Sequence, residues 1–194
     1  MNPAYEIDIG YFSMEIAADR DWPTYAGGLG VLAGDLLRSA ADRGLPMVGV
    51  TLLPRHGYFR QHLDAQGRQS AMPASWKHES VLEPLDAVVS ADIKGRDVRI
   101  RAWRHSTTGV TGHSVPIYFL DADLSENSAP ERALTDALYG GDDAYRLSQE
   151  AILGIGGIRL LRALGHNSIY RFHMNEGHSA LLALALFEQE MAGR

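Results

Sequence analysis

The sequence contains no cysteine, which excludes disulfide bonds and thiolate chemistry. This absence fits a reducing compartment, and we expect the protein in the cytoplasm. Positive charge is also scarce, because 18 Lys and Arg residues stand against 24 Asp and Glu residues for a net charge of −6. Charge therefore gives no reason to expect a nucleic acid or an anionic membrane surface as a partner.

Long apolar runs are missing as well. The first residues, MNPAYEIDIGYF, contain no basic region followed by an apolar core, so we expect neither a signal peptide nor a transmembrane span. Hydrophobic residues still make up 45% of the 194 residues, enough for a core. A chain of this length predicts one domain, or one lobe of something larger.

Both ends of the chain alternate between strand and helix patterns. We expect a strand at 7–13, an amphipathic helix from Leu29 to about Arg43, and a buried strand at 47–53. The last third predicts a helix over 142–164, a short strand at 167–172 and a helix over 177–191. This order predicts an α/β fold with a mainly parallel sheet covered by helices.

The middle of the chain, about 57–121, is rich in β-branched and aromatic residues. Strands are expected at 57–64, 85–93, 97–103 and 114–121, with a hairpin turn at Lys94-Gly95-Arg96-Asp97. This part is either an embellishment of the sheet or a subdomain. Three glycines inside the predicted 142–164 helix indicate tight packing against another element: Gly154, Gly156 and Gly157.

The segment YAGGLGVLAGD is the most informative one. Gly27, Gly28 and Gly30 allow a sharp turn and close approach of a ligand, and the free N–H groups of the following helix point toward that turn. Such a turn suits a phosphate or a sugar oxygen. A tight connection without a ligand is the plain alternative. A dinucleotide fingerprint is disfavoured, because the preceding strand ends early and MVGVTLL offers no acid for a ribose.

Five strings in order carry a family resemblance. They are YFSMEIA (11–17), the glycine turn, GLPMVGVTLL with GYFRQ, LYGGDDAYRLSQEAILGIGGIRLLRALG (138–165) and HMNEGHSALL (173–182). Together they resemble the α-glucan (glycogen and maltodextrin) phosphorylases, specifically the short bacterial and archaeal type. The match is strongest at 9–61 and 138–182, and residues 62–112 contribute little.

The resemblance implies a fold and a reaction. The whole chain, 1–194, would be the Rossmann-like N-terminal lobe of a glycosyltransferase-B type fold with a β-rich insertion. The implied reaction is reversible phosphorolysis, in which inorganic phosphate cleaves an α-1,4-glucan to α-glucose 1-phosphate. The implied cofactor, pyridoxal phosphate, would sit on a lysine of a C-terminal lobe that is absent here. We therefore expect the segment alone to be inactive.

The resemblance also implies roles for individual residues. The turn residues Gly27, Gly28 and Leu29 would present N–H groups to the substrate phosphate and the glucosyl unit. Asp142 corresponds to the acid of a loop that gates the cleft and touches the glucosyl site. Asp143 beside it either shares that role or, as we favour, complements the dipole of a helix start. Glu15 would line the cleft on the glucan-acceptor side; its alternative is a surface or helix-start carboxylate.

A second polar group follows the last predicted strand, where α/β sheets bind ligands. Asn175, Glu176 and His178 are expected on the glucan-acceptor side, with helix capping as an alternative for Asn175. His173 and His178 are five residues apart, which does not fit a zinc pair on a helix, so we expect no metal site. Arg146 is expected in a structural ion pair. Pro54 stands where the resemblance calls for a tyrosine or similar residue.

Two other functions stay open. A nucleotide-sugar glucosyltransferase of the glycogen or starch synthase kind shares the glycine turn, but it usually carries a lysine two residues before the first glycine, and here that position is Tyr25. A non-catalytic carbohydrate-binding module is the third reading. The preferred glucan, regulation, a homo-oligomeric state and whether the chain naturally ends at Arg194 are not fixed by the sequence.

Overall fold

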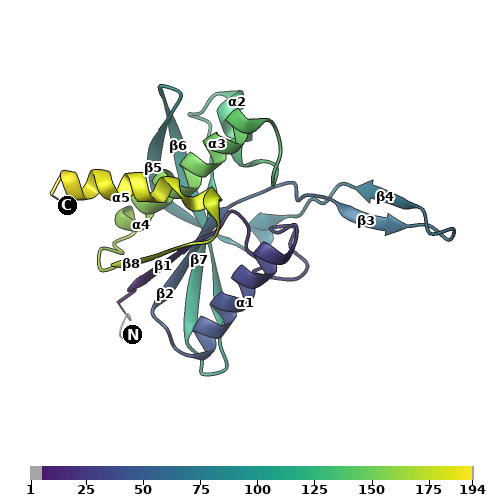
Figure 1. Ribbon diagram of the computed structural model, residues 1–194, viewed down its shortest axis with the longest axis horizontal. Coiled ribbons are helices and arrows are strands. Elements are labelled where there is room, and N and C mark those ends of the chain that lie inside the picture. The colour runs from purple at the N-terminus through teal and green to yellow at the C-terminus, as the bar shows by residue number, and fades with distance from the viewer. Residues whose placement is uncertain (1–5, 194) are drawn as a thin grey trace.

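The computed structural model describes residues 6–193 and contains a mixed six-stranded sheet (Figure 1). The strand order is β5-β6-β7-β2-β1-β8. The neighbours β7, β2, β1 and β8 are parallel, whereas β5 and β6 run antiparallel at one edge. The bounds are β1 Ile9–Phe12, β2 Met47–Leu52, β5 Glu83–Ile93, β6 Arg96–Thr108, β7 Ser114–Asp121 and β8 Arg171–Met174. The predicted α/β class is confirmed.

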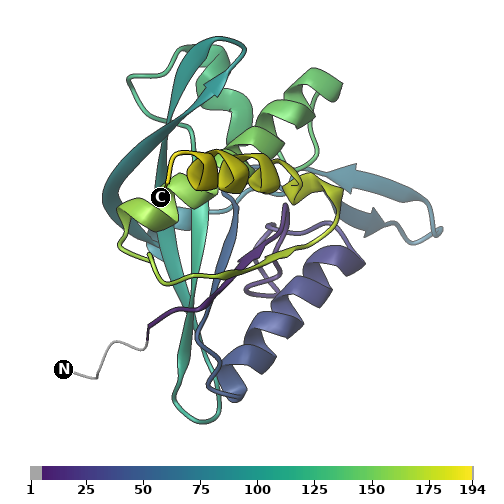
Figure 2. The ribbon, with the colours of Figure 1, turned by 60° about the vertical axis from the view of Figure 1, so that its left-hand side comes forward.

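Helices cover both faces of the sheet (Figure 2). One face packs against α1 (Gly28–Asp42), and the other packs against α3 (Asp143–Ala151), a π-helix (Ile152–Gly156), α4 (Gly157–Ala163) and α5 (Leu181–Met191). Residues 6–193 also contain four short helical segments: η1 His78–Ser80, α2 Ala129–Arg132, η2 Ala133–Thr135 and η4 Gly177–Ser179.

Strand alternation divides the core into two layers. Tyr11 and Phe119 point into the layer beneath α1, whereas their neighbours Phe12 and Leu120 point into the layer beneath α3–α5. Glycines let the helices approach closely. A Cβ on Gly157 would lie 2.8 Å from a ring carbon of Phe12, which confirms the predicted tight packing of the glycine-containing helix.

Two predicted boundaries were wrong. The last strand was expected at 167–172, but β8 spans Arg171–Met174, because Gly165 adopts a positive φ of 87° and the chain is still turning at 167 and 168. The final helix was expected from 177, but residues 177–179 form a 3-10 turn and α5 begins at Leu181. The long 142–164 helix is present, with the π-helix in its middle.

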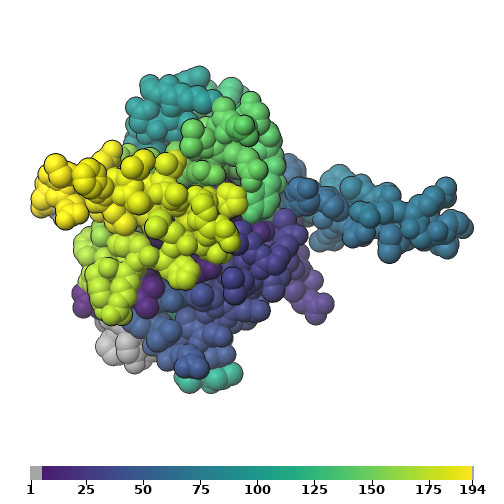
Figure 3. All heavy atoms as spheres, viewed as in Figure 1, coloured from purple at the N-terminus to yellow at the C-terminus, as the bar shows by residue number. Residues whose placement is uncertain are grey.

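The β-rich middle is mostly part of the main sheet. β7 pairs in parallel with β2, and β5 and β6 extend the sheet from β7. The expected hairpin turn is confirmed as the two residues Lys94 and Gly95, with φ of 57° and 74°. In the described part of the chain, only β3 (Arg60–Leu63) and β4 (Gln69–Met72) form a separate two-stranded ribbon, which projects from the body (Figure 3).

Within residues 6–193, no helix is both long enough and apolar enough to cross a lipid bilayer.

Candidate active site

The carboxyl ends of β1 and β8 lie side by side and hold the two polar segments expected from the sequence. Phe12 and Met174 are partners in the parallel ladder, and the backbone N–H of Asn175 donates to the carbonyl of Phe12 at 2.9 Å. The buried Asn175 amide also donates to Ser13 Oγ at 3.1 Å. Its side chain makes no cap bond to the η4 turn, so the capping alternative for Asn175 was wrong.

Glu15 follows β1 and is buried, with only 3% of its surface exposed. Its carboxylate accepts a short hydrogen bond from the backbone N–H of Ala26 and is also hydrogen-bonded to the hydroxyl of Tyr139. Burial raises the pKa of Tyr139, and the negative charge of Glu15 raises it further. The phenol therefore stays protonated and donates to the carboxylate. The alternative of a surface carboxylate at Glu15 was wrong.

His178 and Arg146 surround the same tyrosine. The His178 ring lies 5.6 Å from the Tyr139 ring, and the Arg146 guanidinium lies 5.4 Å from the centre of that ring. Arg146 and His178 Nε2 are 3.3 Å apart. We call these four residues, Glu15, Tyr139, Arg146 and His178, the Glu15 cluster. Among the described residues Arg146 forms no ion pair, so the structural ion pair expected of it was wrong.

The Glu15 cluster is incompletely satisfied. The Nδ1 atom of His178 is buried and has no hydrogen-bond partner within the described part of the chain. A buried polar atom without a partner costs about 1–3 kcal/mol, so native proteins rarely keep one without a reason.

The glycine turn beside the cluster is open. Gly27 caps α1 without any side-chain bond, and the first turn of α1 contains no acid. Gly27 and Gly28 are exposed, and a Cβ on either would meet nothing within 4 Å. Gly30 differs, because a Cβ there would lie 2.4 Å from Tyr25 and 3.2 Å from Glu15. Close packing thus explains why residue 30 is a glycine. It does not explain the glycines at 27 and 28, where the N–H groups of Gly28 and half-buried Leu29 are free to meet an anion.

The remaining predicted residues lie at element ends. Asp142 caps α3, where its carboxylate accepts from the N–H of Tyr145 at 2.8 Å, and Asp143 is exposed in the first turn. Both acids complement the helix dipole. Glu176 is exposed, between Asn175 and His178.

Backbone strain is concentrated around the cluster. Glu176 has φ 63° and ψ −179°, a region that is essentially restricted to glycine, and Tyr139 has φ 58°. Within residues 6–193 only one other non-glycine residue has a positive φ, Lys94 in its hairpin turn. Such strain costs about 1–3 kcal/mol at each residue and is typical of ligand sites.

Comparisons with known proteins agree with the resemblance. No model of a known protein family matches the chain. It is 38% identical over 185 residues to the maltodextrin phosphorylase of Thermococcus litoralis and 39% identical over 198 residues to the glycogen phosphorylase of Mycobacterium tuberculosis. The glycogen phosphorylase of Aquifex aeolicus is 30% identical over 190 residues. The chain is related to the α-glucan phosphorylases.

The alignments cover nearly all of this chain but only a small part of each relative. The three alignments include 92%, 91% and 93% of this chain but only 22%, 21% and 26% of the respective phosphorylases. The chain thus spans about a quarter or less of the length of these phosphorylases.

Sequence reasoning missed Tyr139 as the residue that joins the cluster. The signal was present, since Tyr139 lies within the LYGGDD string that carries the phosphorylase resemblance, two residues before the positive φ of Gly141. The resemblance pointed to the charged Asp142 in this string, whereas the neutral phenol of Tyr139 contacts Glu15.

A second polar network was also missed. Asp121 ends β7, is fully buried, and accepts from Arg101 Nε and Trp103 Nε1 at 3.0 Å each and from Arg55 at 3.2 Å. Arg55 further pairs with Asp123 at 2.9 Å and Asp136 at 3.1 Å. We call this network the Asp121 cluster; its members are Arg55, Arg101, Trp103, Asp121, Asp123 and Asp136.

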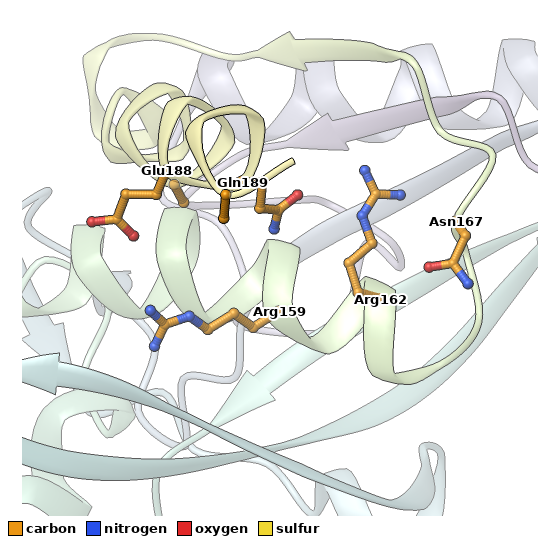
Figure 4. Close-up of a pocket in the computed structure, with 7 residues that line it drawn as sticks. Arg159, Arg162, Asn167, Glu188 and Gln189 are labelled. Carbon is orange, nitrogen blue, oxygen red and sulfur yellow. The ribbon is translucent and has the colours of Figure 1, made fainter. Parts of the chain in front are cut away.

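A hollow of about 770 Å³ lies elsewhere, between α4 and α5 (Figure 4). Its wall includes Asn167, which precedes β8, so it lies toward the amino end of that strand. The guanidinium groups of Arg159 and Arg162 point away from each other, and each donates to a backbone carbonyl, Ser90 and His166 respectively. They do not converge on a shared ligand, and this hollow is not part of the candidate site.

Within the described range, no group of three or more His, Cys, Asp or Glu residues is arranged to hold a metal ion.

Proposed function

We propose that this chain forms part of an α-glucan phosphorylase and contributes one wall of its active site. In the reaction, an oxygen of inorganic phosphate bonds to the anomeric carbon of the terminal glucosyl unit, the bond from that carbon to the next sugar breaks, and the leaving oxygen takes a proton. The products are α-glucose 1-phosphate and a glucan shorter by one unit. Phosphorylase relatives at 38% and 39% identity support this proposal.

One observation carries the proposal: the Glu15 cluster lies next to a glycine turn whose open amides are not explained by packing. The turn offers donors for phosphate, from Gly28 and Leu29, where negative charge is favoured by the helix N-terminus. The cluster offers Glu15 as an acceptor and the half-buried ring of His178 for sugar hydroxyls. A single wall therefore suits an anion and a sugar at adjacent positions.

Glu176 and Asp142 belong to this proposal as supporting residues. We propose that the strained Glu176 backbone fixes the direction in which His178 enters the cluster. Asp142 holds the start of α3, the helix that carries Arg146. Its proposed contribution to the glucosyl site is therefore through the position of the 139–142 loop.

The chain's own residues do not fit pyridoxal phosphate. That group needs a lysine amine, and the chain has two lysines, Lys77 and Lys94, both exposed and the latter within a two-residue turn. We propose that the cofactor is held by polypeptide outside these 194 residues, in a second lobe of a glycosyltransferase-B type fold. The segment alone is then expected to show no turnover.

The synthase alternative receives no support from the turn. Tyr25 occupies the position where those enzymes carry a lysine, and its hydroxyl donates to the carbonyl of Arg20 at 3.2 Å. With tyrosine at position 25, no lysine ammonium group is available there to bind the diphosphate of a nucleotide sugar.

The test is phosphorolysis by the complete polypeptide that carries these residues. With maltoheptaose and inorganic phosphate, we expect glucose 1-phosphate as product. Glu15→Gln should lower kcat/KM by about tenfold or more, because a neutral amide loses a charge-assisted contact in the site. Glu190→Gln on exposed α5 is the control and should match the parent.

Consumption of a nucleotide sugar without glucose 1-phosphate would replace the proposal with the synthase reading. Equal rates in Glu15→Gln and the parent would remove the Glu15 cluster from the active site.

A further inference from the structure

Another cavity is lined by Ala26, the residue whose backbone N–H donates to Glu15. It has a volume of about 390 Å³, within the range of ligand pockets of about 300–1,000 Å³. The loop before the glycine turn forms one side, and the base of the β3–β4 ribbon forms the other. We call it the aromatic pocket; it is lined by Arg20, Asp21, Trp22, Pro23, Tyr25, Ala26, Tyr58, Phe59, Arg60 and Ala74.

The two sides of the pocket are held together firmly. Gly57 packs directly on Pro23, since a Cβ at Gly57 would lie 2.4 Å from the Pro23 Cβ. The N–H of Gly57 donates to the carbonyl of Ala74 at 2.8 Å, which closes the ribbon base. Trp22 is fixed from behind by Trp76, with ring centres 5.1 Å apart. The walls are thus preorganised, although the ribbon beyond them is exposed along both strands.

The surface of the pocket combines apolar rings with free polar groups. Tyr58 and Phe59 leave 57% and 40% of their surface exposed, and their ring centres are 4.8 Å apart. Within residues 6–193, the side chains of Arg20, Asp21 and Arg60 have no hydrogen bond or ion pair. Apolar walls with a few free polar groups are the usual composition of a small-molecule site.

This composition fits a sugar ring better than a free anion. A pyranose has an apolar C–H face, which packs on an aromatic ring, and a rim of hydroxyls, which bond to carboxylate and guanidinium groups alike. The Asp21 carboxylate accepts hydrogen bonds from sugar hydroxyls, but its negative charge repels phosphate. The exposed rings would be unexplained in a phosphate site.

The pocket is also placed to continue the candidate active site. Ala26 lines it, and the N–H of the same residue donates to the Glu15 carboxylate. Gly27, the next residue, begins the open turn. A single backbone segment therefore separates the Glu15 cluster from the aromatic pocket.

We propose that the aromatic pocket is a subsite for glucosyl units of an α-1,4-glucan chain whose reacting end lies at the Glu15 cluster. This inference rests on the proposed phosphorylase function, because that function supplies a polymeric sugar. Tyr58 and Phe59 are the platform, and Arg20, Asp21 and Arg60 bind the hydroxyl rim.

The test compares two pairs of substitutions on the same ribbon in the complete polypeptide. Tyr58→Ala with Phe59→Ala removes the platform. Leu63→Ala with Met72→Ala is the matched control, because these side chains are 60% and 53% exposed and line none of the pocket. Maltoheptaose affinity is measured by calorimetry, phosphorolysis by initial rates, and self-association by sedimentation.

We expect the platform variant to weaken maltoheptaose binding, and to raise its KM, by about tenfold, which is typical of removing aromatic contacts. The KM for phosphate and the control variant should be unchanged. Equal loss in both variants, an unchanged KM for maltoheptaose, or a loss of self-association with intact glucan affinity would each overturn the subsite.

Failure of the proposed function gives a different result. If no phosphorolysis is seen but the platform variant alone loses maltoheptaose binding, the pocket binds glucan and the phosphorylase proposal fails. If phosphorolysis proceeds with equal kinetics in all variants, the phosphorylase proposal holds and the subsite fails.

Discussion

The Asp121 cluster and the Glu15 cluster both lie at carboxyl ends of parallel strands, yet they are built differently. In the Asp121 cluster, the buried carboxylate has three side-chain donors and two arginines to balance its charge. In the Glu15 cluster, the buried carboxylate has a backbone N–H and a phenol, and a histidine nitrogen nearby has no partner among residues 6–193. The first network is satisfied by the protein itself, whereas the second leaves capacity for something else.

Strain follows the same division. Within residues 6–193, the two strained non-glycine residues outside the hairpin turn are Tyr139 and Glu176, and they belong to or adjoin the Glu15 cluster. A protein tolerates such strain where surrounding contacts hold it, and this is common at ligand sites. We infer that the edge of the sheet has one part built for stability, around β7, and one part built for binding, around β1 and β8.

The largest expected effect is on stability, from Asp121→Ala. This change leaves Arg55, Arg101 and the Trp103 N–H without their shared acceptor, and removing one partner of a buried ionic network costs about 3–5 kcal/mol. Chemical denaturation measures the free energy of unfolding. Glu15→Gln should cost only about 1 kcal/mol, because the amide oxygen can still accept from Ala26.

The comparison fails if these two stability losses are equal. It also fails if Asp121→Ala removes activity from a protein whose unfolding free energy is unchanged, since the Asp121 cluster would then have a functional role.

A smaller effect of the opposite sign is expected from Glu176→Gly. Glycine adopts φ 63° and ψ −179° without a Cβ clash, so relief of strain should exceed its entropic cost and raise the free energy of unfolding by about 1 kcal/mol. Lys94→Gly is the control, because Lys94 has a positive φ in a turn far from the candidate site. Activity should fall in Glu176→Gly alone, as its backbone becomes free to move.

A loss of stability in Glu176→Gly would show that this backbone is not strained. Unchanged activity would show that the strain does not position His178.

The sequence predicted the fold better than the site. Periodicity located most of the elements, because each strand and helix buries a face that the pattern records. The strand at 171–174 was placed four residues early, since Asn167 and Ser168 form a turn and the ladder begins only where the N–H groups of Tyr170 and Arg171 reach Asp8.

Side-chain contacts between distant segments were harder to foresee. The pairing of Glu15 with Tyr139 depends on how the loop before α3 crosses the end of β1, and no local pattern encodes that crossing. Asp121 looked like an ordinary strand end for the same reason, because its partners come from positions 55, 101 and 103. Open glycines at 27 and 28 were recognisable in advance, since glycine itself is the signal.

The smallest effect concerns pH and reports on the Asp121 cluster through His78. Burial lowers the pKa of His78; Arg55 and Arg101 also lower it, while Glu79 and Asp121 act in the opposite direction. Because the folded pKa lies below the unfolded value of about 6.5, His78 contributes stability that is present above pH 6.5 and is lost as pH falls below it.

His78→Gln should therefore flatten part of the fall in unfolding free energy between pH 7.5 and 5.5, measured by denaturation at each pH. Asp121→Asn removes a negative charge near His78 while both arginines stay, so the pKa of His78 should fall further in that variant. Proton NMR of the imidazole follows this titration. A higher pKa for His78 in Asp121→Asn would mean that the arginines leave the cluster when their acceptor is neutral, and that Asp121 holds them in place.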